Sequence, residues 1–182
     1  MSSDAGSVAH PVRIETPRLL LDAHVTDDFA ALAALWADPQ IVRYIGGRQS
    51  SAQESWMRLL RYRGLWALLG YGYWAVREKS SGKYIGDLGF ADFHRACEPS
   101  IIGVPEAGWV IAGWAQGQGF AREALGAALV WLDASPTTNR SCCLIAPDNG
   151  ASIHLAESHG FARRGTVVVD GKDSLLFYRF KP

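Results

Sequence analysis

The feature that most constrains this chain is a glycine-rich turn between an apolar strand and an apolar helix. The turn is Gln-Gly-Gln-Gly-Phe-Ala at residues 116–121, and large apolar residues crowd the segment 106–112 before it. Apolar residues then recur at helical spacing from Ala121 to Leu132. Glycine allows a left-handed backbone and close approach of a ligand, because it has no Cβ. The first N–H groups of a helix lack internal acceptors, so the turn predicts a phosphate or pyrophosphate site.

Two common phosphate-binding motifs do not fit this turn. A P-loop needs Lys followed by Ser or Thr after its second glycine, where this chain has Phe120 and Ala121. A dinucleotide-binding fingerprint needs a third glycine three residues after Gly119, where this chain has Arg122. A third interpretation needs no ligand, because the glycines could simply let a helix pack closely on a sheet.

Length, charge and cysteine spacing limit the class of protein. A chain of 182 residues has the size of one domain. Its 18 basic and 18 acidic side chains balance, so composition gives no reason to expect nucleic acid or an anionic membrane as a partner. The sequence has no apolar run long enough to span a bilayer and no signal-peptide core. Cys97 and the adjacent Cys142 and Cys143 form neither a zinc-ligand nor a redox spacing, which favours a cytoplasmic, metal-free protein with inert thiols.

Hydrophobic period and turn residues divide the chain into a tail and a domain. Residues 1–12 are small and polar and predict a flexible tail, whereas residues 13–182 predict a single α/β domain with a mixed sheet. Helices are expected to begin at Thr26, at the capping box Ser51-x-x-Glu54, at Ala121 and at Asn149. Strands are expected over residues 13–22, 73–78, 84–93, 106–112, 141–146, 166–169 and 174–180.

Read from Gln116, the turn has the pattern Gln-x-x-Gly-x-Ala and resembles the pyrophosphate loop of GNAT-type N-acetyltransferases. Further segments resemble the RimJ/RimL-like branch of that family, in the same order along the chain. They are Thr-Pro-Arg-Leu-Leu-Leu at 16–21, Ile-Gly-Asp-Leu-Gly at 85–89, Glu-Ala-Gly-Trp at 106–109, and Asn-Gly-Ala-Ser at 149–152 with Gly-Phe at 160–161. The resemblance covers the chain from Thr16 to its C-terminus.

The resemblance implies a GNAT-like single domain, in which a mixed central β-sheet is flanked by helices and a splayed strand pair binds acyl-CoA. The strand near Val110 would separate from the strand at 141–146, and a backbone N–H near Val110 would polarise the thioester carbonyl. An ordinary buried strand is the alternative. The implied cosubstrate is acetyl-CoA, without a metal. The residues expected to contact it are Trp109, Val110, Ile111, Gln116, Gly117, Gln118, Gly119, Phe120, Ala121, Arg122 and Asn149.

Acetyl transfer to an amine also needs a base for the amine proton and an acid for the leaving thiolate. Glu106 is the candidate base, because it shares a strand face with Gly108, which should leave room beside it; a structural ion pair is the alternative. Ser152 is the candidate acid in the first turn of a helix, although such serines often bond only locally. Many GNAT enzymes use a tyrosine as the acid, and the sequence suggests none near Ser152. Asn149 could bind the pantetheine arm, cap the helix, or do both.

Other polar and aromatic residues have weaker claims on the site. Asp87 is expected to be structural, His94 to lie in a loop, and His154 and His159 to face solvent. Arg122 could add positive charge at the pyrophosphate or could simply be solvated. Aromatic residues of the helical N-terminal part are mostly expected in the core, and some could line an acceptor pocket: Trp36, Tyr44, Trp56, Tyr62, Trp66 and Tyr71.

These features together predict an acetyl-CoA-dependent N-acetyltransferase in which a primary amine attacks the thioester directly. The acceptor would be a protein N-terminus or a small-molecule amine, and the oligomeric state is left open, with a homodimer as one option. The alternative from another class is a non-catalytic acyl-CoA-binding sensor of the same fold. A sensor has no need of Glu106 or Ser152, so the presence of both favours the enzyme.

Overall fold

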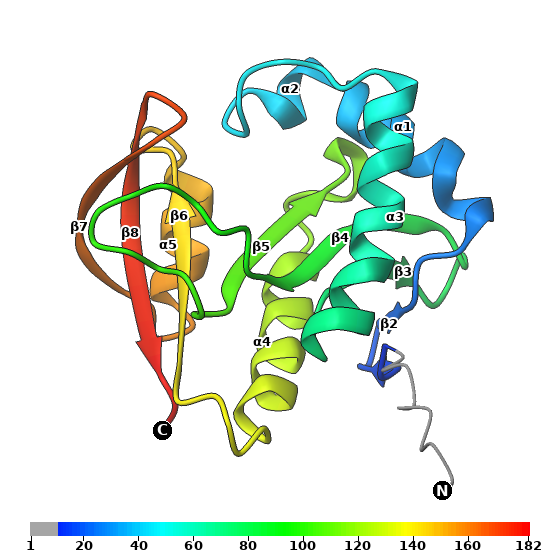
Figure 1. The fold of residues 1–182 in the computed structure, drawn as a ribbon. Coiled ribbons are helices and arrows are strands. Elements are labelled where there is room, and N and C mark those ends of the chain that lie inside the picture. Colours follow the sequence, from blue (N-terminus) through cyan, green and yellow to red (C-terminus); the bar gives the residue numbers. More distant parts are fainter. Residues whose placement is uncertain (1–10) are drawn as a thin grey trace, which may run out of the picture.

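Residues 11–182, which are the residues that the computed structural model describes, contain eight strands and five α-helices (Figure 1). The strands are β1 (Ile14–Glu15), β2 (Leu19–Asp22), β3 (Tyr73–Glu78), β4 (Tyr84–Ala91), β5 (Glu106–Ile111), β6 (Arg140–Ile145), β7 (Ala162–Val169) and β8 (Lys172–Phe180). The helices are α1 (Phe29–Ala37), α2 (Pro39–Val42), α3 (Ala52–Leu69), α4 (Phe120–Asp133) and α5 (Gly150–Glu157), with 3-10 turns η1 (Thr26–Asp28) and η2 (Gly113–Ala115).

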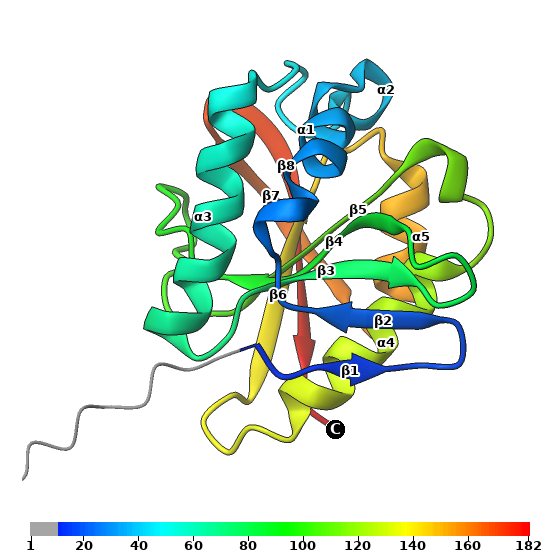
Figure 2. The ribbon, with the colours of Figure 1, turned by 90° about the vertical axis from the view of Figure 1, so that its right-hand side faces the viewer.

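The strands form one mixed sheet in the order β1-β2-β3-β4-β5-β6-β8-β7. Neighbouring strands are antiparallel except β5 and β6, which run parallel. Parallel neighbours need a crossover connection, which α4 supplies. Helices α1 and α3 lie on one face of the sheet, whereas α4 and α5 lie on the other (Figure 2). The predicted fold class, a mixed sheet flanked by helices, is confirmed.

Alternation along β5 divides its side chains between the two faces of the sheet. Val110 packs with buried residues of α1 and α3. Trp109 and Ile111 pack instead with the cluster that contains the apolar face of α4. Because successive side chains of a strand point to opposite faces, Glu106 and Gly108 face the α1 and α3 side together with Val110.

Strands β5 and β6 are joined at one end only. Each strand is six residues long, yet they share the single registered pair Glu106 with Cys142. The amide of Cys142 donates to the Pro105 carbonyl at 3.0 Å, and beyond this point the strands diverge (Figure 1). The splayed strand pair expected from the resemblance is therefore present. Its unpaired backbone groups are available to an extended ligand, as at other open strand edges.

Most predicted strand bounds agree with the structure to within two residues, and two segments differ more. Residues 13–22 form β1 and β2 instead of one strand, because the chain turns between them. At this turn Thr16 Oγ1 accepts a hydrogen bond from the Leu19 amide at 2.9 Å. The last hairpin also begins earlier than expected, since β7 starts at Ala162 and not at Thr166.

The helix starts were predicted with mixed success. Thr26 does not cap a helix, because it lies inside η1, whose N-cap is Val25. The capping box at α3 is confirmed: Glu54 N donates to Ser51 Oγ at 3.2 Å, and Ser51 N donates to Glu54 Oε2 at 2.7 Å. None of the helices in the described part of the chain is long and apolar enough to cross a membrane.

The predicted tail, residues 1–12, is described only at its last two residues. Residues 1–10 lie outside the described residues. Val12, however, is held in place, because its carbonyl accepts a hydrogen bond from Trp74 Nε1 at 2.7 Å. The folded domain therefore begins no later than Val12.

The three cysteines are all free thiols. Cys142 and Cys143 lie within β6 and are 0% and 1% exposed, whereas Cys97 is half-buried in the loop before β5. Burial raises the pKa of Cys142 to about 12. A raised thiol pKa keeps the protonated, unreactive form at neutral pH, so the prediction that this pair is not nucleophilic agrees with its surroundings.

We expect a thiol reagent such as dithionitrobenzoate to modify one cysteine quickly in the native protein and the other two only after unfolding. Because the pKa of Cys142 lies well above the assay range, raising the pH from 7 to 9 should not bring out the slow thiols. Cys97→Ala should abolish the fast phase. Three thiols reacting at one rate in the folded protein would contradict the buried placement.

Candidate active site

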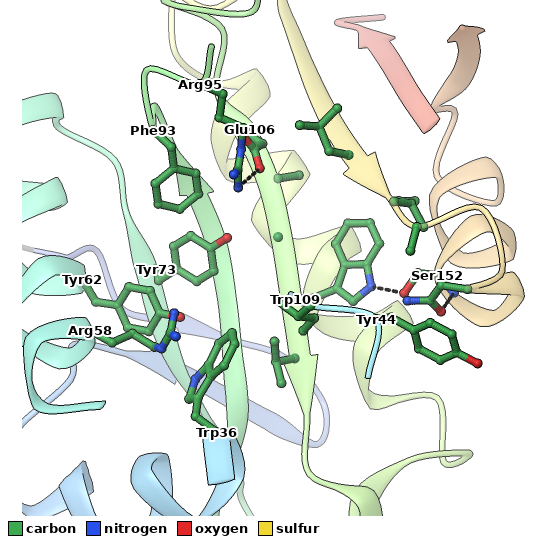
Figure 3. A pocket seen from close by; sticks show the side chains of 18 of the residues that line it. Trp36, Tyr44, Arg58, Tyr62, Tyr73, Phe93, Arg95, Glu106, Trp109 and Ser152 are labelled. Carbon is green, nitrogen blue, oxygen red and sulfur yellow. Dashed lines mark hydrogen bonds and ion pairs between the residues drawn. The ribbon is translucent and has the colours of Figure 1, made fainter. Parts of the chain in front are cut away.

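Two cavities open beside β5 and share part of their walls. The loop cavity, about 470 Å³ in volume, lies between the end of β5, the loop 116–119 and the first turns of α4 and α5. The second cavity, about 430 Å³ in volume, lies between α3, β5 and the end of β6 (Figure 3). We call it the arginine cavity, because Arg58, Arg61 and Arg95 line it. Both cavities are lined by Tyr44, Ile45, Trp109, Val110, Asn149 and Ser152. Groups bound in the two cavities would meet at this shared wall.

The loop cavity contains the predicted pyrophosphate turn. Its walls include every residue that the sequence assigned to the cosubstrate except Gln118. Gly117 and Gly119 adopt left-handed backbone, with φ of 74° and 80°. The backbone N–H groups of residues 117–122 have no acceptor among the described residues, and α4 has no side-chain cap. A series of unpaired amides at a helix N-terminus is suited to bind a phosphate group.

Side chains from elsewhere fix the shape of this loop. Arg18 Nη1 donates to the Gln118 carbonyl at 2.9 Å, and Arg18 Nε donates to Glu123 Oε2 at 2.6 Å. Gln116 Nε2 donates to the Ile111 carbonyl at 2.8 Å. The Thr-Pro-Arg segment and the first glutamine of the motif therefore hold the loop in place, while the backbone amides stay available to a ligand.

The backbone of β5 narrows the expected carbonyl site, an N–H near Val110, to two amides. Ala112 N donates to a β4 carbonyl at 2.8 Å, and Val110 is in register with Asp87 of β4. Because N–H groups alternate in direction along a strand, the Val110 N–H also points at β4 and is already paired. The N–H groups of Trp109 and Ile111 point the other way, toward the gap before β6. We therefore expect one of these two amides, and not Val110, to polarise the thioester.

Glu106 is a buried member of an ion pair at the wall of the arginine cavity. It is 7% exposed, and Arg95 Nε and Nη2 donate to its two carboxylate oxygens at 2.7 and 2.8 Å. The expectation of open space beside Gly108 is wrong. Tyr73 reaches across Gly89 and places its hydroxyl where a Gly108 side chain would lie, 1.9 Å from an ideal Cβ position. A base at Glu106 therefore works next to a guanidinium and a phenol.

Ser152 lies at the shared wall with its hydroxyl already oriented. Trp109 Nε1 donates to Ser152 Oγ at 3.2 Å, which leaves the hydroxyl hydrogen free to point elsewhere. Figure 3 shows this contact between β5 and α5. Asn149 Oδ1 accepts from the Ser152 amide at 3.2 Å, so the predicted helix cap is confirmed. Both side chains also line the two cavities.

A sequence profile described as an acetyltransferase (GNAT) domain matches residues 18–162. This span contains the loop, the splayed strands and both candidate catalytic residues. The chain belongs to the GNAT acetyltransferase family. It is accordingly an acyltransferase of the class that carries out acetyl-CoA-dependent N-acetylation.

Individual GNAT relatives cover nearly the whole chain. A solved GnaT-family acetyltransferase from Bordetella pertussis is 31% identical, has a TM-score of 0.81, and matches over 93% of this chain and 99% of its own. The N-acetyltransferase YoaA of Bacillus subtilis (strain 168) is 24% identical over 158 residues, 85% of each protein. The spermidine N-acetyltransferase of Vibrio cholerae, solved with CoA and spermine, shares the fold at 20% identity with a TM-score of 0.71, over 91% of this chain and 97% of its own.

Tyr44 is one of the aromatic residues that the sequence offered for an acceptor pocket, although the sequence did not single it out. It lies just after α2. It nevertheless lines both cavities together with Ser152, and Figure 3 shows it beside the first turn of α5. The expectation that no tyrosine lies near Ser152 is therefore wrong. Only the tertiary packing of α2 against the splayed strands brings the two residues together.

Asp87 is structural, as expected, and it supports the floor of the arginine cavity. The carboxylate is 0% exposed. It accepts hydrogen bonds from His24 Nε2 at 2.7 Å, from Trp36 Nε1 at 3.1 Å and from the Tyr84 hydroxyl. A buried carboxylate with several donors holds those donors in fixed positions. Trp36 in turn lines the arginine cavity.

The remaining aromatic residues divide between cavity and core. Trp36, Tyr44 and Tyr62 line the arginine cavity. Trp66 is 1% exposed in the core, and Trp56 packs edge-on against Phe29 with ring centroids 5.3 Å apart. Of the six aromatic residues that the sequence offered for an acceptor pocket, those that border neither cavity are Trp56, Trp66 and Tyr71.

The histidines differ from expectation in one case. His94 lies in an exposed loop, 3.6 Å from Asp92, and His154 is exposed at the rim of the loop cavity. His159 does not simply face solvent. Its Nε2 lies 3.0 Å from the carbonyl of Arg122 and so connects α5 to the first turn of α4. The Arg122 side chain itself is exposed at the loop cavity.

Proposed function

We propose that this protein transfers the acetyl group of acetyl-CoA to a primary amine by direct attack, without a covalent enzyme intermediate. The observation that carries the proposal is the shared wall of the two cavities. One cavity ends at the unpaired amides of residues 117–122, which suit a pyrophosphate. The other is open to an acceptor. Where they meet, Trp109 and Ser152 lie in hydrogen-bond contact.

Groups at the shared wall and elsewhere in the two cavities each have a part in this reaction. The amine nitrogen forms a bond to the thioester carbon as the carbon–sulfur bond breaks. The N–H of Trp109 or Ile111 stabilises the charge on the carbonyl oxygen. Glu106, whose two oxygens also accept from Arg95, receives the amine proton through a water. Ser152 donates a proton to the departing sulfur, and Tyr44 is the rival donor.

The sequence motifs and the free thiols support finer assignments. The segments at 16–21, 85–89, 106–109 and 149–152 support a RimJ/RimL-like member. Three free thiols suit a reducing, cytoplasmic setting. The acceptor is a protein N-terminus or a small amine, and a homodimer stays one option for the assembly.

The direct test is release of CoA thiol from acetyl-CoA in the presence of a panel of amines. An N-acetyltransferase releases thiol only with an accepted amine and forms the acetylated amine in equal amount. A protein that binds acetyl-CoA tightly in calorimetry yet releases no thiol with small amines or N-terminal peptides would instead be the sensor.

Ser152→Ala should lower kcat by about 10- to 100-fold, the usual value of a hydrogen bond to a charged group, while CoA affinity hardly changes. The reason is that the hydroxyl acts mainly when negative charge develops on sulfur. Tyr44→Phe is the matched variant, because it also removes only a hydroxyl at the shared wall. Unchanged turnover in Ser152→Ala with a large loss in Tyr44→Phe would transfer the role of acid to the tyrosine.

A further inference from the structure

The arginine cavity carries more positive than negative side chains. Its walls include Arg58 and Arg61 of α3 and Arg95 of the loop before β5, whereas its single acidic residue is Glu106. Arg95 already pairs with Glu106 through two hydrogen bonds. Within residues 11–182, no carboxylate forms a salt bridge with Arg58 or Arg61. The cavity therefore keeps two guanidinium groups without counter-ions.

Arg58 is held in position, so its charge is part of a built site. Its guanidinium carbon lies 3.5 Å from the centroid of the Trp36 ring, and its Nη2 donates to Ser50 Oγ at 3.3 Å. Trp36 is fixed in turn by its hydrogen bond to the buried Asp87. Arg58 Nε is buried and has no partner among the described residues. Figure 3 shows Arg58 between Trp36 and Tyr62 at the cavity wall.

Arg61 lies one turn further along α3, on the same face of the helix. Its guanidinium carbon is 5.4 Å from the centroid of the Phe93 ring, and that of Arg95 is 4.8 Å from the same centroid. Two guanidinium groups thus share one aromatic ring at the edge of the cavity. Each guanidinium carries five N–H donors in a planar fork that fits a carboxylate or phosphate.

We propose that the acceptor is a small amine that also carries an oxyanion, a carboxylate or phosphate-type group, which Arg58 and Arg61 bind. The inference rests on the proposed function and names the substrate class for it. A polyamine would place further positive charge beside these arginines, which opposes its binding. The cavity of about 430 Å³ has the volume of a small-molecule site.

The same charges assist the chemistry. Positive groups near an ammonium favour loss of its proton, because they destabilise the charged form. An amine held beside Arg58 and Arg61 is therefore more readily converted to the nucleophilic free base. The anionic group of the same molecule offsets the guanidinium charges and draws the amine into the cavity. One arrangement thus supplies both selectivity and a nucleophile.

The test compares amines of one length that differ only in the charge at the far end. Thiol release is measured at saturating acetyl-CoA with 4-aminobutyrate, 3-aminopropylphosphonate, butylamine and 1,4-diaminobutane. We expect kcat/KM to be at least about tenfold higher for the two anions than for butylamine, and lowest for the diamine. A higher value for the carboxylate or for the phosphonate identifies the preferred anion, and either order supports the inference. Preference for butylamine or for the diamine would overturn it.

Variants connect the preference to the named residues. Arg58→Gln and Arg61→Gln should each raise KM for the anionic amines, on the order of 10- to 100-fold, and change the reaction of butylamine by much less. Arg58→Lys should restore part of the effect. Arg63→Gln is the matched control, because it removes the same charge from the same helix outside both cavities. If Arg58→Gln fails to fold, the Arg61→Gln variant tests the inference, because Arg61 is exposed. An anion preference that persists in every folded variant of these two residues would refute their role.

The outcome also separates this inference from the proposed function. If no amine releases thiol, the proposed function fails. Calorimetry of 4-aminobutyrate binding to the CoA-loaded protein then decides the inference alone. Binding that Arg61→Gln weakens and Arg63→Gln leaves unchanged supports an anion site. Absence of binding, or equal binding in both variants, overturns it.

Discussion

Glu106→Gln is expected to lower turnover at neutral pH by about 10²- to 10⁴-fold, the usual value of general-base help. The substitution keeps the shape of the side chain and removes its basicity. An unperturbed primary amine has a pKa of about 10. At neutral pH most of the amine is therefore protonated and must lose a proton before it can attack the thioester. The loss should shrink as pH rises, because more amine then loses its proton without the enzyme. The measurement is the pH–rate profile of thiol release at saturating acetyl-CoA.

The ion pair with Arg95 makes controls necessary. A purely structural pair would make Glu106→Gln and Arg95→Gln behave alike, because each leaves one buried partner alone. If the carboxylate is catalytic, the Arg95→Gln enzyme still contains it. That enzyme should then keep a turnover rate whose pH dependence Glu106→Gln loses. Glu98→Gln removes an exposed acid of the same loop and should change neither rate nor profile. A Glu106→Gln enzyme with the wild-type profile would show that the carboxylate is not the base.

Gly119→Val is expected to weaken CoA binding by roughly 100-fold while the domain still folds. Gly119 has φ of 80°, a conformation that a β-branched residue almost never adopts. The cost of the strained conformation, about 1–3 kcal/mol, would be relieved by a shift of the loop. Such a shift moves the amides of residues 117–122 away from the positions that suit a pyrophosphate. Calorimetry with CoA measures the loss.

Gly82→Val is the matched control for backbone strain. Gly82 has φ of 68° in the turn between β3 and β4, and an added Cβ meets open space there. Its valine variant should lose similar stability in denaturant unfolding and keep full CoA affinity. Wild-type affinity in a folded Gly119→Val protein would contradict the assignment of the loop.

The parts of the site that could be predicted are those set by neighbours in sequence. The turn 116–121 was found because its glycines and the helix after it specify a local backbone, and the structure gives both glycines the left-handed conformation. The cap at Asn149 and the box at Ser51 are local for the same reason. The splayed strand pair followed from the resemblance, because an array of short motifs carries the topology with it.

The parts that were missed depend on contacts between distant segments. Tyr73 fills the space beside Gly108 only because β3, β4 and β5 align its ring over two glycines. The helix that contains Arg58 was expected, but sequence period does not say that this face of α3 meets a cavity. His159 meets the Arg122 carbonyl across 37 residues. The residue types alone do not predict contacts between segments that lie so far apart in the sequence.

Strands β5 and β6 share a single registered pair, so little backbone hydrogen bonding joins the two parts of the sheet. The two parts of the one sheet are strands β1 to β5 and strands β6 to β8. An extended amide-bearing arm laid in the gap would act as an inserted partial strand and bridge the two parts. Occupancy would then stabilise the fold itself, by an amount that grows with the logarithm of ligand concentration. A cosubstrate bound in this way would complete the backbone pairing that β5 and β6 leave open.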